Sequence, residues 1–121
     1  MNSAIRPAVN LPQVFLYLQP VDFRRSYKGL SALVECELGH NPFSGQLYVF
    51  TNRRRNKIKA LFWEENGFVL YYKSLSAEKF KWPKSPDEVM RITGQQINWL
   101  LDGYDISLMK PHKKLHYESV F

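Results

Sequence analysis

The middle of the chain contains three consecutive stretches with the two-residue alternation of β-strands, and they constrain the fold more than any other feature. They cover residues 47–51, 57–64 and 68–75 and are joined by the segments "NRRRN" and "ENG". An Asn-Gly pair favours a tight hairpin turn, because such a turn requires positive φ angles at its central residues. The stretches therefore predict an antiparallel β-meander with a tight turn at Asn66-Gly67.

The second of these stretches has two different faces. Ile58, Ala60 and Phe62 alternate on one of them. The opposite face carries a mixed set of side chains, namely Lys57, Lys59, Leu61 and Trp63. Alternation of this kind is typical of a sheet that packs on a core with one face and leaves the other partly solvated.

Two helices are expected beside the strands. Residues from about 26 to 38 show helical spacing, and Gly39 follows in the position that commonly ends a helix. Thr93 and Gln96 form a capping-box pattern at the start of the second helix, which Gly103 ends. The apolar stripe of the first helix consists of Tyr27, Leu30, Leu33, Val34 and Leu38.

Three further short segments complete the expected fold. Residues 14–18 read as a strand, and residues 78–82 and 89–92 as possible short strands. Strands and helices in this arrangement predict an α+β fold, an antiparallel β-meander of four to six strands with two packed α-helices.

The chain is expected to form a single domain. Its 121 residues leave little room for a second one. Residues 14–106 are predicted to form the domain, residues 1–13 an irregular lead-in, and residues 107–121 a basic, partly mobile tail.

The net charge indicates the class of partner. A formal charge of +6 and a pI of about 9.5 produce a positive surface potential that attracts polyanions, nucleic acid first and an anionic membrane second. No apolar run approaches the roughly 20 residues of a membrane span. Cys36 is the single cysteine, which suits a reducing compartment. We therefore expect a soluble cytoplasmic protein without membrane contact.

The sequence offers little enzyme chemistry. It has no glycine-rich phosphate loop, and nothing marks a base for Ser44. His112 and His116 are spaced for a shared metal ion but lie in the lysine-containing tail. A metal-dependent nuclease would need converging carboxylates, which the spacing of Asp and Glu does not indicate. We predict no catalytic residues, metal or cofactor, and keep a nuclease as a minor alternative.

The strongest candidate site is the cluster of arginines between the first two strands. Arg53, Arg54 and Arg55 are adjacent, and each guanidinium can contact a phosphate with two hydrogen bonds. Lys57 and Lys59 extend the charge along one strand face. If five cations met phosphates, log affinity would fall with log salt at a slope of about −4.5. The alternative is a solvated turn with no ligand.

Further basic and aromatic residues extend the candidate surface. The additional nucleic-acid-binding candidates are Arg24, Arg25, Lys79 and Lys81. Exposed aromatic side chains can stack on unpaired bases or form a protein interface. The possible protein interface comprises Trp63, Tyr72 and Trp82, with ordinary core packing as the alternative.

Several stretches resemble a known family. "PVDFRRSYKGLSALV", "NPFSGQLYVFTNRRRNKIKALFWEENGFVLYYKSL", "KFKWP" and "INWLLDGYD" occur in the order and spacing of the small accessory proteins, often called TnpB, of the IS66 class of bacterial insertion sequences. The resemblance runs from about Val14 to Ile106. This family is unrelated to the RNA-guided nucleases that share the TnpB name.

The resemblance implies a process and a set of partners. Such a protein is made alongside the transposase, is required for efficient transposition, and is not itself the catalytic transposase. The implied partners are DNA, at transposon ends or in the transposase–DNA complex, and the transposase of the same element. A DNA-binding accessory factor and a protein adaptor both fit. The family usually has a small residue soon after the arginine pair, where this chain has Asn56, so the turn type stays open.

Overall fold

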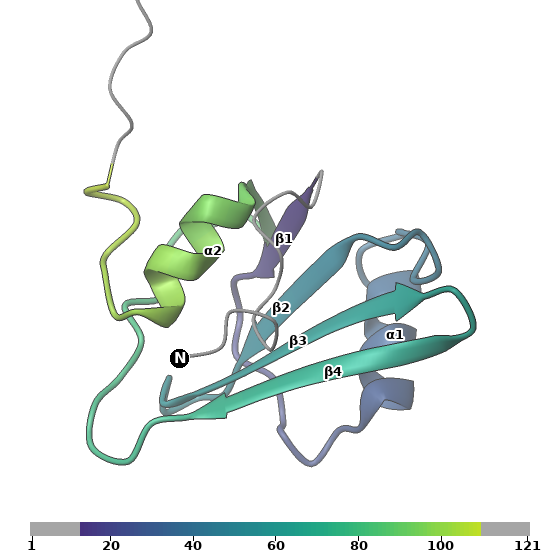
Figure 1. Ribbon diagram of the computed structural model, residues 1–121, viewed down its shortest axis with the longest axis horizontal. Coiled ribbons are helices and arrows are strands. Elements are labelled where there is room, and N and C mark those ends of the chain that lie inside the picture. Colours follow the sequence, from purple (N-terminus) through teal and green to yellow (C-terminus); the bar gives the residue numbers. More distant parts are fainter. Residues whose placement is uncertain (1–12, 110–121) are drawn as a thin grey trace, which may run out of the picture.

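The computed structural model describes residues 13–109 as one five-stranded sheet with a helix on each face (Figure 1). The elements in chain order are β1 (Val14–Tyr17), α1 (Tyr27–Cys36), β2 (Leu47–Thr51), β3 (Lys57–Glu64), β4 (Gly67–Ser74), β5 (Val89–Ile92) and α2 (Gly94–Leu101). The strand order across the sheet is β4-β3-β2-β1-β5. The predicted α+β class is confirmed, with a strand number inside the predicted range.

One pair of strands corrects the expected all-antiparallel meander. β1 runs parallel to β2, whereas the pairs β1–β5, β2–β3 and β3–β4 are antiparallel. The reason is the helix between the first two strands. α1 carries the chain back across the sheet, so that β2 starts from the same end as β1, as parallel neighbours require a crossover connection.

The two helices cover opposite faces of the sheet, so its central strands pack in a core on each face. Ile58 and Ala60 of β3 pack in one core with Ile97 and Leu100 of α2. Leu61 packs in a second core with residues of α1, including Leu30 and Val34. The predicted alternation of β3 is therefore correct, but the expected partly solvated face is covered by α1 and its flanking loops.

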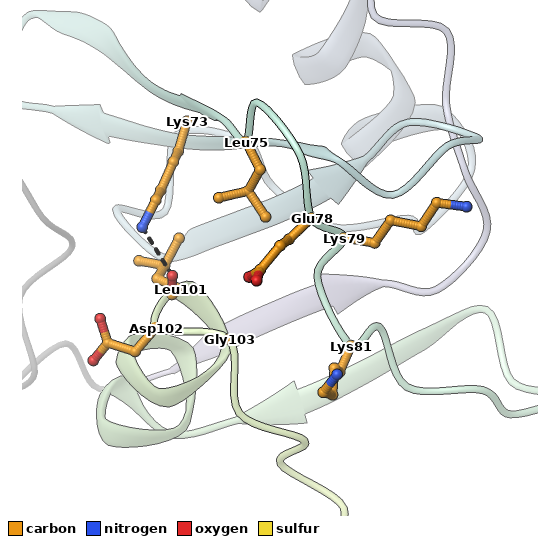
Figure 2. A pocket seen from close by; sticks show the side chains of 8 residues that line it. All are labelled: Lys73, Leu75, Glu78, Lys79, Lys81, Leu101, Asp102 and Gly103. Carbon is orange, nitrogen blue, oxygen red and sulfur yellow. Dashed lines mark hydrogen bonds between the residues drawn. The ribbon is translucent and has the colours of Figure 1, made fainter.

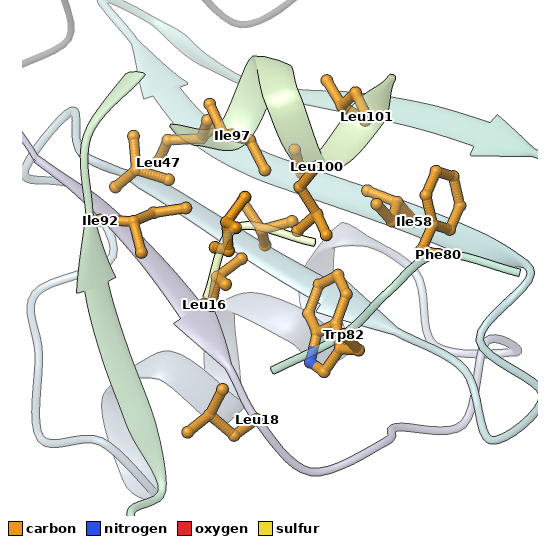
Figure 3. Close-up of a cluster of buried hydrophobic side chains, with 14 residues drawn as sticks. Leu16, Leu18, Leu47, Ile58, Phe80, Trp82, Ile92, Ile97, Leu100 and Leu101 are labelled. Carbon is orange, nitrogen blue, oxygen red and sulfur yellow. The ribbon is translucent and has the colours of Figure 1, made fainter. Parts of the chain in front are cut away.

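The core on the α2 side also receives side chains from a loop. Figure 3 shows Phe80 and Trp82 directed into the cluster formed by the sheet and α2. Residues 78–82 are not a strand, which corrects that expectation. Trp82 is buried, and its indole N–H donates to the carbonyl of Tyr17 at 3.2 Å. The segment is thus fixed by side-chain burial instead of by strand pairing.

Local signals in the sequence mark the second helix accurately and the hairpin turn less so. The capping box between Thr93 and Gln96 is present at the start of α2. At the β3–β4 hairpin, β4 already begins at Gly67, and Glu65 has the positive φ angle, +50°. The turn therefore lies one residue earlier than Asn66-Gly67 predicts. Neither helix in residues 13–109 is long and apolar enough to cross a membrane.

Candidate nucleic-acid interface

The three adjacent arginines project from a turn that is organised by one asparagine. The side-chain oxygen of Asn52 accepts the backbone N–H groups of Asn56 and Lys57, both at 3.1 Å. Its amide donates to the side chain of Asn56 at 2.7 Å, and its carbonyl accepts the N–H of Arg55 at 3.1 Å. We call residues 52–56 the arginine turn. Asn52 was not singled out in the sequence, although an asparagine just before a turn is a known signal for such bonding.

The turn places an arginine where a glycine would be least strained. Arg55 has φ +59°, in the left-handed region. For a residue with a Cβ atom, this conformation raises the free energy of the folded state by roughly 1–2 kcal/mol, a strain that glycine avoids. The residue of the arginine turn in the left-handed conformation is therefore Arg55, one position before Asn56.

The charges of the turn are available to a ligand. Arg53 and Arg54 are exposed, and Arg55 is half-buried. Within residues 13–109, none of the three guanidinium groups donates a hydrogen bond or forms an ion pair. Three neighbouring cations without counter-ions form a site with a strong preference for anions.

A second basic segment lies directly against the turn. The N–H of Phe80 donates to the carbonyl of Arg55 at 2.7 Å, and the N–H of Leu75 donates to the carbonyl of Asn56 at 2.8 Å. Phe80 is buried, whereas Lys79 and Lys81 on either side of it are exposed. The structure thus brings these two predicted site residues to the arginine turn, more than twenty positions away in the sequence.

The pocket next to this segment is not a dedicated anion cavity. It has a volume of about 540 Å³ and lies between the end of β4, residues 78–81 and the end of α2. The ammonium of Lys73 donates to the carbonyl of Leu101 at 2.9 Å, and Glu78 projects into the pocket (Figure 2). Lys79 extends away from both of them. The cations therefore form an open surface, not an enclosed site.

The third basic segment is attached to the same end of the sheet. The N–H of Val21 donates to the carbonyl of Thr51, the last residue of β2, at 2.9 Å. Arg24 and Arg25, which follow, are both exposed. Arg24 is engaged, because its guanidinium forms an ion pair with Asp22 at 2.6 Å. Hydrogen bonds from Arg24 lower the pKa of the Asp22 carboxyl to about 2, so the pair is fully charged at neutral pH.

Lys59 does not belong to the proposed phosphate-binding set. It is only 7% exposed, and its ammonium donates to the carbonyls of Phe23 and Arg25, both at 2.8 Å. The same ammonium lies 4.9 Å from the ring centre of Phe23 and 5.7 Å from that of Tyr72. Burial lowers the pKa of Lys59. Its role is structural: it fastens the loop that carries Arg24 and Arg25 to β3.

The three aromatic residues predicted as a protein interface do not form one face. Trp82 is buried in the core on the α2 side, so it cannot contact a partner. Tyr72 is half-exposed near the end of β4, opposite Lys59, and lies against Phe23. Trp63 lies near the far end of β3. The sequence could not show this, because the burial of Trp82 depends on a loop folding over the sheet.

Trp63 instead belongs to a different aromatic group, which the sequence did not reveal. Its ring centre lies 5.0 Å from that of Phe43 and 5.1 Å from that of Phe68. Phe68 also contacts Phe43, at 5.4 Å, and Tyr27, at 5.8 Å. Phe43 and Tyr27 are 53% and 43% exposed. We call these four residues the aromatic cluster; it lies at the opposite end of β3 from the arginine turn.

Metal chemistry finds no support in the described part of the chain. Among residues 13–109, no three or more histidine, cysteine, aspartate and glutamate side chains are grouped so that they could hold a metal ion. The histidine pair His112 and His116, considered above, lies outside the described residues.

Comparison with known proteins identifies one family and two relatives. The IS66 Orf2-like protein family (TnpB_IS66) matches residues 12–111. The uncharacterized protein y4jC of Sinorhizobium fredii is 32% identical over 98 residues, covering 81% of this chain and 84% of that protein. The uncharacterized protein y4hO of the same organism is 29% identical over 93 residues, covering 77% and 81%. No solved structure matches significantly.

The structural role of Lys59 predicts a stability difference between two neighbouring lysines. Lys59→Met would leave the carbonyls of Phe23 and Arg25 without their donor and should lower the free energy of unfolding by roughly 1–3 kcal/mol. Lys57→Met, at a half-buried lysine without such bonds, should change it by less than about 0.5 kcal/mol. Urea denaturation of both variants measures the difference. Equal stability of the two would show that the Lys59 contacts contribute nothing.

Proposed function

The chain belongs to the IS66 Orf2-like family of insertion-sequence proteins, and we propose that it is a non-catalytic accessory factor that binds DNA phosphates during transposition. The contact surface consists of the arginine turn and the cations next to it, and the partner is DNA at transposon ends or in the transposase–DNA complex. A protein that acts on bacterial DNA in this way works in the cytoplasm.

The observation that carries this proposal is the convergence of unneutralised cations at one end of the sheet. Hydrogen bonds hold the arginine turn against the segment that carries Lys79 and Lys81. Lys57 adjoins the turn at the start of β3. The proposed surface comprises six of the nine cations predicted from the sequence: Arg53, Arg54, Arg55, Lys57, Lys79 and Lys81. If all six met phosphates, the salt slope would be about −5.

The chemistry of this surface predicts binding with little sequence preference. Guanidinium and ammonium groups contact phosphates, which position a protein on DNA without reading the bases. The rings of the aromatic cluster lie at the other end of β3. Tyr72 is half-exposed and pairs with Lys59 nearer the turn, but stacking of a base on such a ring is tolerant of sequence. Backbone binding of this kind suits a factor that stabilises a protein–DNA assembly whose sequence recognition is supplied by another component.

A second candidate function is favoured by the aromatic cluster. Two of its four rings are about half exposed. Phe43, Trp63 and Phe68 contact one another, and Phe68 also contacts Tyr27. Aromatic residues are enriched at protein interfaces, and Trp and Tyr are frequent among the few residues that dominate the binding energy. In this alternative, the protein is an adaptor that holds the transposase, and the cations assist from the opposite end.

The proposed DNA site is tested by a variant that removes the charge of the turn but keeps its shape. Arg53→Ala, Arg54→Ala and Arg55→Gly together should flatten the salt slope of DNA binding by about 3, because three phosphate contacts are lost. Glycine is used at position 55 because φ there is +59°. Fluorescence anisotropy with labelled duplex and single-stranded DNA over a salt series measures the slope.

The matched control removes three exposed cations elsewhere. Lys28→Ala, Lys84→Ala and Arg91→Ala together cause the same change in net charge, from exposed residues that are not among the six proposed contacts. Their effect on the slope should be small. If both triple variants bind DNA alike, binding follows net charge and not the arginine turn.

Labelled DNA should stay intact with added magnesium or manganese; cleavage would contradict a non-catalytic role.

The ion pair between Asp22 and Arg24 predicts a variant that binds DNA more tightly. Asp22→Asn removes the counter-charge of Arg24 but keeps the side-chain oxygen that accepts the N–H of Arg24 at 2.9 Å. Affinity at moderate salt should rise roughly two- to five-fold, and the salt slope should steepen by about 1. Glu35→Gln, on the exposed surface of α1, is the control for the loss of one negative charge. Equal effects of the two variants would exclude Arg24 from the site.

The adaptor alternative makes a separate prediction. Phe43→Ser should weaken co-purification of the protein with the transposase of the same element after nuclease treatment. The reason is that it removes the most exposed ring of the aromatic cluster. DNA affinity should stay unchanged, and the arginine-turn variant should keep the transposase. Loss of the complex on nuclease treatment alone would instead identify DNA as the bridge.

A further inference from the structure

We propose that the outer edge of β4 is a dimerisation surface, at which two copies of the chain pair their β4 strands antiparallel about a twofold axis through Leu70. This interface is independent of the DNA-binding surface and lies on a different side of β3.

The edge is long and regular. β4 is the terminal strand of the sheet, has eight residues, and pairs with β3 residue by residue from Gly67 to Ser74 without a bulge. It contains no proline. Natural proteins usually block an edge strand with a bulge, a proline, a charge or short length. The other edge, β5, follows that rule, because it has only four residues.

The backbone groups that face outward can be assigned. The N–H of Leu75 donates to the carbonyl of Asn56, which makes these two residues a hydrogen-bonded pair in continuation of the β3–β4 ladder. Hydrogen-bonded pairs alternate along an antiparallel ladder. The N–H and C=O groups of the even-numbered residues Phe68, Leu70 and Tyr72 therefore face the open edge. Within residues 13–109, none of these outward groups has a hydrogen-bond partner.

The charged side chain of β4 that could prevent pairing at this edge points away from it. Lys73 is the only charged residue of β4. Its ammonium donates to the carbonyl of Leu101 at the end of α2, so it lies against the α2 face of the sheet. The remaining side chains of the strand are apolar or aromatic, apart from the terminal serine. Two of these side chains, Val69 and Tyr72 on opposite faces of β4, are 36% and 49% exposed to solvent.

The strand is complementary to itself in one register. An antiparallel twofold pairing in a continuous sheet keeps side chains on the same face, so residues of equal parity oppose each other. With Leu70 opposite its own copy, Phe68 faces Tyr72 and Val69 faces Tyr71. Aromatic–aromatic and aromatic–β-branched pairs are among the favoured cross-strand pairs. Lys73 faces Gly67, so no like charges are opposed.

The same register joins the outward-facing backbone groups. Phe68, Leu70 and Tyr72 all expose N–H and C=O groups, and each meets a partner residue that also does. Each such pair exchanges two hydrogen bonds. A strand from a different protein could satisfy the backbone groups, but the side-chain pairing of this edge is already complete with a second copy.

Dimerisation would also set the distance between two arginine turns. Each turn adjoins the end of β4 that lies four residues from the axis at Leu70. With a rise of about 3.4 Å per residue and strand spacing of about 4.8 Å, the turns would lie on the order of 30 Å apart. This distance is close to one turn of B-form DNA, roughly 34–36 Å. This consequence rests on the proposed DNA function, whereas the dimer does not.

Cysteine cross-linking tests the interface and its register. In a Cys36→Ser background, Leu70→Cys places two thiols opposite each other across the axis and should give a disulfide-linked dimer under mild oxidation. Val69→Cys is the matched control, because in this register its copies are diagonal and too far apart, beyond the limit of about 7 Å between Cα atoms. Cross-linking of Val69→Cys as efficiently as of Leu70→Cys would overturn the register.

The unmodified chain supplies a test that no substitution can confound. Sedimentation velocity without DNA should show a concentration-dependent monomer–dimer equilibrium, and Val69→Lys, which puts a charge on the edge, should shift it to monomer. Tyr104→Lys, at a 52% exposed position outside β4, should leave it unchanged. A wild-type chain that stays monomeric at every concentration would overturn the proposal. Since DNA is absent, failure of DNA binding by the arginine turn does not affect the outcome.

Discussion

Strand β3 is the element on which the rest of the structure depends, because it serves two cores at once. Ile58 and Ala60 face the core beneath α2, and Leu61 faces the core beneath α1. A strand buried on both sides cannot shift its register by one residue without exchanging the side chains of the two cores. β3 therefore fixes the geometry of what is attached to its ends. The arginine turn precedes it and the aromatic cluster lies at its far end, roughly 25 Å away for eight residues of extended chain.

The parts of the fold that follow from local sequence were predictable, and the parts that depend on distant contacts were not. The two faces of β3 and the cap of α2 at Thr93 need only the spacing of neighbouring residues, and both are confirmed. The parallel pairing of β1 with β2 depends on how α1 packs, which no short window of sequence contains. The strand–helix–strand order of residues 14–51 was the available signal, because parallel neighbours need such a crossover. For the same reason Trp82, in a segment that resembles a strand, is held by a core formed far from it in the sequence.

The residues of the candidate site fall into the same two groups, those predictable from local sequence and those that depend on distant contacts. The exposure of Arg53 and Arg54 follows from their position in a turn, whereas the burial of Lys59 depends on a loop more than thirty residues before it. A signal for Lys59 did exist: it shares its strand face with Leu61, and α1 needs an apolar face to pack on. A lysine there can remain only if its ammonium finds partners, because an unpaired buried charge is very costly. The carbonyls of Phe23 and Arg25 are those partners, so the same contact that removes Lys59 from the surface keeps Arg25 at it.

The cations of this chain are thus used in two ways, and the chemistry of each side chain fits its use. Lys59 and Lys73 both donate to backbone carbonyls, the first at a loop and the second at the end of α2. An ammonium is compact and has three donors, so it suits converging carbonyl oxygens inside a fold. The arginines of the turn have a planar guanidinium that matches a phosphate with two parallel hydrogen bonds, and Arg53 and Arg54 are exposed to solvent. Inward use of Lys73 has a second effect: it leaves β4 without a guarding charge, so a contact that stabilises α2 also keeps the edge of the sheet open for pairing.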